Sequence, residues 1–295
     1  MSEVLFSNEY ARITKTVLNE TVELLSIEHE HCSAQVSLYA GQVLSYKPSN
    51  TQELFWLSKD SLFEPGKAIR GGIPLCWPWF GENNKQTAQQ KAGNHGFARQ
   101  VTWQVSAISA DETAVYLSLS FQGENQHSLW PHKCHLQQDF ILGKDFKQSL
   151  IMTNLANEPV EYTGALHSYF YVSHPEHVVI ERLDGVAFDD KLTGLKQSQA
   201  SLPNCQGPID RIYHSGNTMV LQDKVWQREI EIHSNTSQWV LWNPGTETAS
   251  AMTDIHAGGE HEFVCLEAAN TNWQQIEAGQ TAVMQQHIKV HSLKR

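Results

Sequence analysis

Hydrophobic and polar residues alternate along most of this chain with a period of two, which is typical of β-strands that bury one face. Large apolar residues occupy every second position in 115–121. Isoleucines alternate with charged and polar residues in 229–233. Further segments expected to form strands are 34–40, 146–153, 177–182, 238–242, 263–267 and 281–290. The chain contains no apolar stripe of helical spacing that runs for three turns or more.

Turn-forming residues separate these segments, as at Leu183-Asp184-Gly185 and Asn243-Pro244-Gly245. Many strands joined by turns predict an all-β fold of stacked antiparallel sheets or a barrel. A length of 295 residues lies within the range of one large all-β domain. Because no low-complexity linker interrupts the chain, we expect a single domain over 1–295.

The segment 61–99 interrupts the alternating pattern. It is rich in Gly, Pro and Trp and has no clean period. Residues such as Leu75, Trp77 and Phe97 are too apolar for a disordered segment. Long irregular stretches in compact domains are commonly functional loops. We therefore expect a packed loop beside a functional site.

The composition and the net charge of the chain limit the classes of molecule that it is expected to bind. Hydrophobic residues make up 40% and charged residues 18% of the chain, as in globular proteins. The formal net charge of −11 argues against non-specific nucleic-acid binding, which needs a basic face. An anionic small ligand stays possible, because a few arginines suffice for a locally positive pocket.

The cysteines and the N-terminus indicate a cytoplasmic protein. Five cysteines without a CxxC pair argue against a disulfide framework and for a reducing compartment. The first ten residues lack the apolar core of a signal peptide. No run of 18 apolar residues is present, so no membrane span is expected.

Candidate acid–base chemistry centres on one histidine and one glutamate. If 162–172 is a strand, His167 shares a face with Tyr169 and Tyr171, as in a polar aromatic pocket. The alternative is a partly buried structural histidine. Glu267 closes an apolar run and lies either at a solvated strand end or in a pocket. If the two meet, the nearby carboxylate should keep the pKa of His167 high, and the cationic His167 should keep the pKa of Glu267 low.

Two arginines in the irregular segment are candidate anion ligands. Arg70 precedes Gly71 and Gly72, which permit positive φ and close backbone approach. Arg99 follows later in the same segment, and the planar guanidinium grips phosphate bidentately. The alternative is a pair of solvated surface arginines.

Motifs for metals and cofactors are weak in this chain. The histidine pairs within 29–31 and 132–135 do not match a strong metal-ligand spacing. The chain has no GxGxxG before a helix and no GxSxG elbow. We therefore expect no metal and no cofactor.

Taken together, these segments resemble the aldose-1-epimerase-like superfamily, and more closely its glucose-6-phosphate 1-epimerase branch. Six blocks occur in the family's order across about 20–290: Arg70-Gly71-Gly72-Ile73-Pro74, Trp77-Pro78-Trp79-Phe80-Gly81, His95-Gly96-Phe97-Ala98-Arg99, Leu166-His167-Ser168-Tyr169-Phe170, Asp210-Arg211-Ile212-Tyr213 and Glu267-Ala268-Ala269-Asn270. The resemblance implies a galactose-mutarotase-like β-supersandwich with the sugar in a concave cleft.

The resemblance also implies roles for seven residues. His167 would be the general acid and Glu267 the general base. Arg70 and Arg99 would contact the phosphate of a sugar phosphate. The other implied substrate contacts are Asn94, which stands where relatives often have glutamine, His95 and Asp210.

Two other functions stay open at this point. A plain aldose 1-epimerase would act on neutral galactose or glucose, which do not need the arginine pair. A non-catalytic sugar-phosphate-binding protein could share the fold, because fold does not fix function. Such a protein would be free to lose His167 or Glu267, and both are present.

Overall fold

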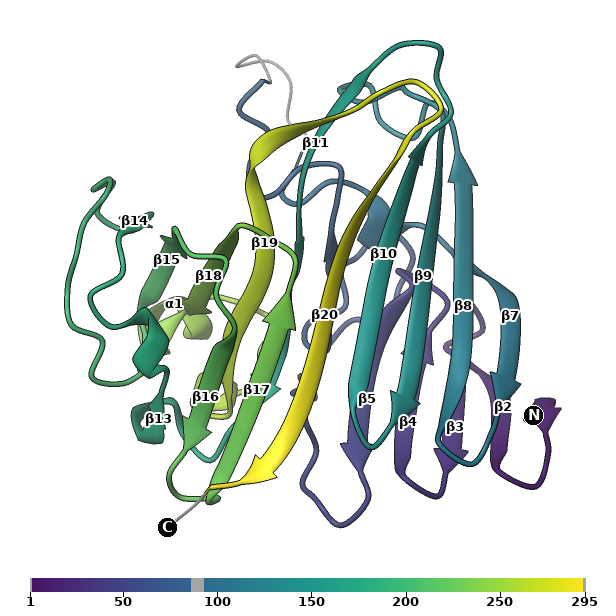
Figure 1. Ribbon diagram of the computed structural model, residues 1–295, viewed down its shortest axis with the longest axis horizontal. Coiled ribbons are helices and arrows are strands. Elements are labelled where there is room, and N and C mark those ends of the chain that lie inside the picture. Colours follow the sequence, from purple (N-terminus) through teal and green to yellow (C-terminus); the bar gives the residue numbers. More distant parts are fainter. Residues whose placement is uncertain (1, 86–92, 294–295) are drawn as a thin grey trace.

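The computed structural model describes residues 2–85 and 93–293, which form three β-sheets (Figure 1). The five-stranded sheet contains, in spatial order, β1 (Glu3–Ser7), β2 (Ala11–Leu18), β3 (Val22–His29), β4 (Cys32–Ser37) and β5 (Gln42–Pro48). The eight-stranded sheet contains β13 (Val178–Val179), β16 (Met219–Asp223), β17 (Arg228–Ser234), β20 (Thr281–Ser292), β10 (Phe146–Asn154), β9 (Cys134–Gly143), β8 (Ala114–Gly123) and β7 (Gln104–Ala110).

The seven-stranded sheet carries the residues of interest. Its strands, in order, are β14 (Phe188–Asp190), β15 (Ile209–Tyr213), β18 (Gln238–Asn243), β19 (Phe263–Ile276), β11 (Val160–Leu166) and β6 (Leu75–Cys76), and β12 (Tyr169–Tyr171) also pairs with β19. The long strands β19 and β20 follow each other in the chain and belong to different sheets, so they join the two larger sheets (Figure 1).

The sheets bury a common core. In Figure 1 the eight-stranded sheet lies in front, with β2 to β5 behind its β7–β10 half. One cluster of buried side chains includes Ile13 from the five-stranded sheet, Leu117 and Met284 from the eight-stranded sheet, and Leu166 and Leu241 from the seven-stranded sheet. The expected all-β fold of stacked antiparallel sheets is therefore confirmed, and burial of the alternating apolar positions is what holds the layers together.

Most predicted strands are present. The segments 115–121, 146–153, 229–233, 238–242 and 281–290 lie within strands, and 263–267 begins the longer β19. The strand expected over 34–40 ends at Ser37, because Ala40 adopts a positive φ of 70° in a turn.

The strand expected over 177–182 is wrong. The structure has the two-residue strand β13 there, between the 3-10 turns η2 (Pro175–His177) and η3 (Glu181–Leu183). The apolar run Val178-Val179-Ile180 has the appearance of a buried strand, but Pro175 opens a turn just before it. Strands that the alternating pattern did not single out include β1 to β3, β5, β7 and β9.

The strand expected over 162–172 is interrupted at its most interesting point. Strands β11 and β12 both pair with β19, and His167 and Ser168 lie between them outside the ladder. The backbone N–H of His167 donates instead to the carbonyl of Pro74 at 3.0 Å. The register against β19 is the same on both sides of the interruption, with Leu166 opposite Ala268 and Tyr169 opposite Cys265.

The described parts of the irregular segment are packed, as expected. Its described parts, 61–85 and 93–99, contain only β6 and the start of the 3-10 turn η1 (Ala98–Gln100), while 86–92 lie outside the described residues. Trp77, Trp79 and Phe97 are buried. Apolar side chains therefore anchor this segment against the sheets.

All five cysteines are buried and carry free thiols. Over residues 2–85 and 93–293, no helix is long and apolar enough to cross a membrane.

Candidate active site

A cavity of about 250 Å³ lies where the seven-stranded sheet meets the irregular segment. Its lining residues are Arg70, Phe80, Asn94, His95, Arg99, His167, Lys191, Asp210, Val240, Trp242, Met252 and Glu267. All seven site residues expected from the sequence are among them.

The sheet register sets the floor of this cavity. Val240 on β18 lies opposite Glu267 on β19, and Trp242 on β18 lies opposite Asp210 on β15. Because residues directly opposite each other on antiparallel strands point to the same face, these four side chains share one side of the sheet. Two carboxylates from strands far apart in the sequence are thus fixed on a rigid platform.

His167 and Glu267 meet at the buried end of the cavity. The His167 Nε2 atom lies 3.3 Å from the Glu267 Oε1 atom, and the side chains are 8% and 1% exposed. The other polar atoms of the pair, His167 Nδ1 and Glu267 Oε2, have no hydrogen-bond partner within the described part of the chain. Buried polar atoms normally have partners, so these two are suited to bind ligand hydroxyls.

The environment pushes both members of this pair toward their neutral forms. Burial raises the pKa of Glu267 well above its ordinary value, and the nearby Asp210 charge adds to the rise. Burial lowers the pKa of His167 well below its ordinary value, with Arg99 and Arg70 adding to the fall. The expectation of a high pKa for His167 and a low pKa for Glu267 is therefore wrong. Desolvation outweighs the attraction between the two charges.

Aromatic rings fix the orientation of the His167 imidazole. The Tyr169 ring stacks on it with centroids 4.8 Å apart and an angle of 8° between the ring planes. His95 and Trp242 contact the imidazole edge-on at 5.8 Å and 6.1 Å. His95 itself accepts a hydrogen bond at Nδ1 from the Gly81 N–H, so its Nε2 atom carries the proton and is a donor.

Arg70 is already matched by an anion. Its Nε donates to Asp254 Oδ2 at 3.0 Å, and one terminal nitrogen lies 2.9 Å from the same oxygen. The other terminal nitrogen donates to the Tyr169 hydroxyl at 2.9 Å. Arg70 therefore holds the tyrosine that supports His167, and it lines the cavity with its remaining N–H groups.

Arg99 and Lys191 are paired with carboxylates less closely than Arg70 is. Arg99 donates to the Asn94 carbonyl at 3.0 Å, and no carboxylate among the residues in the structural description lies within salt-bridge distance of it. Lys191, just after β14, places its Nζ atom 3.5 Å from Asp210 Oδ2. Asp254 balances the positive charge of Arg70. Arg99 and Lys191 are therefore the cations that make this cavity favourable for an anion.

Comparison with known proteins shows the family of the chain that forms this cavity. The family model described as aldose 1-epimerase matches residues 23–291. The chain belongs to the aldose 1-epimerase family. The cavity with its histidine–glutamate pair is thus the candidate active site of an aldose 1-epimerase family member.

Relatives within the aldose 1-epimerase family cover nearly the whole chain. A protein of Escherichia coli (strain K12), provisionally named glucose-6-phosphate 1-epimerase, is 32% identical over 92% of this chain and 91% of its own. A Salmonella typhimurium protein with the same provisional name is 33% identical over 84% of this chain and 83% of its own.

Solved structures of similar proteins agree on the fold. A crystal structure of a Salmonella typhimurium protein, provisionally described as a mutarotase, has a TM-score of 0.85 and 31% identity over 95% of this chain and 94% of its own. A galactose mutarotase-like protein from Clostridium acetobutylicum has a TM-score of 0.74 over 97% of this chain and 100% of its own, with 14% identity. The fold is galactose-mutarotase-like.

The sequence did not predict every residue that lines the candidate active site. Lys191 lies in a turn without a motif, and Phe80, Val240, Trp242 and Met252 were not singled out as site residues. Phe80 could have been found, because it belongs to the block that carries Trp77 and Trp79. Lys191 had no such signal, since its place in the cavity depends on the pairing of β14 with β15.

Proposed function

We propose that this protein interconverts the α and β anomers of a hexose 6-phosphate, with glucose 6-phosphate as the first candidate. One observation carries the proposal: an acid–base pair and two cations, Arg99 and Lys191, line the same small cavity. Ligand sites usually have about 300–1,000 Å³, so a cavity of about 250 Å³ suits a monosaccharide rather than a longer glycan.

In the proposed reaction Glu267 removes the proton from the anomeric O1 hydroxyl, and His167 gives a proton to the ring oxygen O5. The C1–O5 bond breaks as the C1–O1 bond becomes a carbonyl. The open aldehyde rotates about C1–C2, and the steps run in reverse with the roles exchanged to close the ring on the other face. Each proton transfer contributes roughly 10²–10⁴-fold.

The proton count of the pair fits this scheme. The active pair holds one proton, on His167 when the cycle starts in the direction written above. The pKa directions favour that proton on Glu267, with a neutral His167. The two arrangements differ only by transfer of a proton across the 3.3 Å contact. The pH profile therefore reports the pair rather than either residue alone.

The two cations, Arg99 and Lys191, would bind the substrate and take no part in the proton transfers. A phosphate group held by Arg99 and Lys191 would fix the far end of the sugar and so orient C1 against the acid–base pair. Asp210, the present partner of Lys191, would then be able to accept a hydrogen bond from a sugar hydroxyl. Asn94, His95 and Arg70 complete the proposed binding set. The provisional names of the relatives support the same substrate class.

The test is two-dimensional NMR exchange between sugar anomers with catalytic amounts of the protein. Glucose 6-phosphate, glucose and galactose are compared at equal concentration. We expect faster exchange for glucose 6-phosphate, because a neutral sugar makes no use of the cations.

Two outcomes would overturn this proposal. Faster exchange only for the neutral sugars would identify a plain aldose 1-epimerase. Binding of glucose 6-phosphate without faster exchange would identify a sugar-phosphate-binding protein without this activity.

A further inference from the structure

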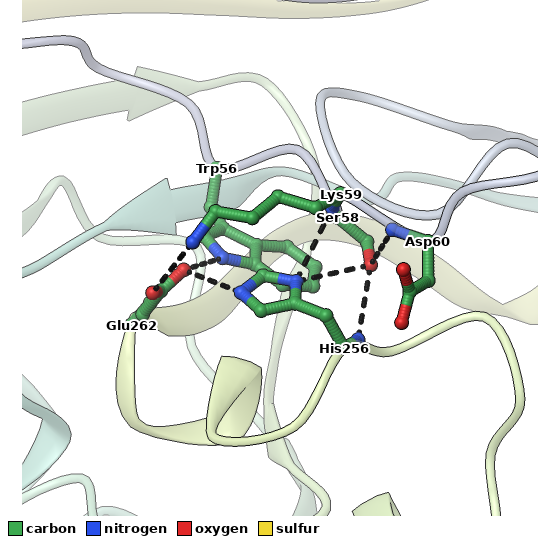
Figure 2. A network of polar contacts seen from close by, with 6 residues as sticks. All are labelled: Trp56, Ser58, Lys59, Asp60, His256 and Glu262. Atoms are coloured by element: carbon green, nitrogen blue, oxygen red, sulfur yellow. Dashed lines mark hydrogen bonds and ion pairs between the residues drawn. The ribbon is translucent and has the colours of Figure 1, made fainter.

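A second histidine–glutamate pair lies outside the cavity, in a network of polar contacts (Figure 2). The Glu262 Oε2 atom accepts a hydrogen bond from the Trp56 indole N–H at 2.7 Å and lies 3.1 Å from His256 Nε2. The Lys59 Nζ atom lies 3.6 Å from the other carboxylate oxygen. One carboxylate thus ties the segment around 56–60 to the segment 254–262.

The tautomer of His256 follows from its neighbours. Its Nδ1 atom accepts a hydrogen bond from the Lys59 backbone N–H at 3.2 Å and lies 3.3 Å from the Ser58 hydroxyl. The proton is therefore on Nε2, which donates to Glu262 (Figure 2). Both nitrogens of His256 are occupied, so the ring is fixed in its plane.

Stacked rings lead from this network to the candidate active site. The His256 ring stacks on Trp56 with centroids 5.6 Å apart and a 24° angle (Figure 2). Trp56 stacks on Tyr169 at 5.8 Å and 22°, and Tyr169 stacks on His167 at 4.8 Å and 8°. Four rings in succession thus connect Glu262 with the proposed general acid.

The segment that carries Glu262 reaches Tyr169 by a second route. Asp254 binds Arg70, and Arg70 donates to the Tyr169 hydroxyl. The hydroxyl and one stacked neighbour of the tyrosine ring are therefore both set by 254–262. Among the described contacts of the His167 ring, the Tyr169 stack is the one that lies parallel to its face.

We propose that Glu262 is a positioning residue for His167 and acts through Trp56 and Tyr169. The carboxylate sets the tilt of the indole, the indole sets the tyrosine, and the tyrosine sets the imidazole against the sugar ring oxygen. This inference rests on the proposed function for its kinetic consequence and on the ring geometry alone for its structural one. Small misplacements of an acid or base reduce kcat strongly without changing substrate affinity much.

The experiment compares four variants with the wild-type protein. Glu262→Ala removes the acceptor, and Glu262→Gln keeps one oxygen for Trp56 and His256. Glu260→Ala is the matched control, because Glu260 belongs to the adjacent 3-10 turn η4 (Gly259–His261) and also pairs with a histidine, His261, at 3.3 Å. Glu260 takes no part in the ring stack. Trp56→Phe serves as a milder second variant, since it keeps a ring and loses only the N–H donor and some volume.

Two readouts are taken. Anomer exchange of glucose 6-phosphate gives kcat and KM. NMR of protein with labelled histidine gives the His167 ring-proton shifts, with the resonance identified by its loss in His167→Asn. For Glu262→Ala we expect kcat to fall about tenfold with KM changed less than about twofold, because only orientation is lost. The His167 ring protons should move downfield as they leave the shielding face of Tyr169.

Glu262→Gln should restore both readouts, Glu260→Ala should change neither, and Trp56→Phe should change both in the same direction as Glu262→Ala. Wild-type kcat and shifts in Glu262→Ala would overturn the inference, and so would an equal loss in Glu260→Ala. A wild-type protein that accelerates no sugar would instead remove the proposed function, while the shifts would still decide whether Glu262 positions His167.

Discussion

Glu267 lies within β19 with 1% of its side chain exposed, and burial raises its pKa well above 4.5. Below that ordinary value the carboxyl is protonated in the folded and unfolded chains alike. As the pH rises, the unfolded chain loses its proton first, so the free energy of unfolding falls until the folded pKa is passed. Burial of Glu267, the proposed base, therefore costs stability at neutral pH.

Glu267→Gln tests both effects at once. Glutamine keeps the shape of the side chain and cannot act as a base, so kcat for anomer exchange should fall by roughly 10²–10⁴-fold. The free energy of unfolding above pH 4.5 should be equal to or higher than that of the wild type, with a difference that grows as the pH rises. Urea unfolding at several pH values measures this. Near-normal kcat would remove Glu267 from its role, and a variant less stable than the wild type at pH 8 would contradict the cost of the buried carboxyl.

At the scale of the element, the turn after Arg70 shows why two glycines occur there. Gly72 has a φ of +60°, and a Cβ atom at this position would lie 2.0 Å from the Val43 carbonyl oxygen. The Gly72 N–H donates to the Trp56 carbonyl, and its own carbonyl accepts from the Tyr169 N–H. The turn thus approaches β5 and β12 closely, and only glycine permits this.

Gly72→Ala should therefore destabilise the protein strongly. The control is Gly66→Ala, because Gly66 has a φ of +82° and nothing within 4 Å of an added Cβ. We expect Gly66→Ala to lower the free energy of unfolding by about 1–2 kcal/mol, the cost of a left-handed backbone for alanine. Gly72→Ala should lower it by about 3 kcal/mol or more, since a backbone contact must also move. Equal losses in urea unfolding would show that close approach to β5 is unimportant.

The elements that alternation predicted correctly are those in which one face meets the core, such as β8 and β17. The alternation over 162–172 is real, but it does not reveal that the ladder breaks at His167 and Ser168. There the His167 N–H donates to the carbonyl of Pro74, a partner more than 90 residues away in the chain. The apolar run Val178-Val179-Ile180 does not form a long strand, and a short buried run has no period of its own that would show this.

At the scale of the whole molecule, a chain of buried amides connects the sheets beside the candidate site. The Ser168 hydroxyl donates to Gln286 on β20, at 3.2 Å, and Gln286 donates to Gln148 on β10, at 2.9 Å. Gln148 donates to Gln138 on β9, which donates to the Gly41 carbonyl. Such a chain holds a register only if every member is paired, so it fixes the break at His167–Ser168 relative to all three sheets.

The residues of the candidate site could be predicted only in part, because some of them come together only in the assembled fold. Six of the seven expected lining residues belong to the blocks that carry the family resemblance, and Asn94 directly precedes one of them. Lys191 was missed because a lysine in a polar turn has the same pattern whether it faces solvent or a cavity. The pKa directions were misjudged because the sequence does not show how deeply Glu267 and His167 are buried. Depth is a property of the assembled sheets, not of a segment.

The charge of the whole molecule opposes the proposed substrate. A net charge of −11 repels a phosphorylated sugar, so attraction must come from cations that are local to the cavity. Lys191 and Lys196 separate the two effects, since both follow β14 and each carries one positive charge. The Lys191 Nζ atom faces Asp210 at the cavity, whereas Lys196 pairs with Asp189 and is 70% exposed.

Lys191→Met and Lys196→Met lower the net charge equally, yet we expect only Lys191→Met to raise KM for glucose 6-phosphate. A hydrogen bond to a charged group contributes about 1.5–3 kcal/mol. Since 1.4 kcal/mol corresponds to a factor of ten, KM should rise about tenfold or more. The KM for a neutral sugar should not change in either variant, because it has no phosphate. Equal increases in both variants would assign the effect to the charge of the whole molecule, and no increase in either would leave Arg99 as the main phosphate anchor.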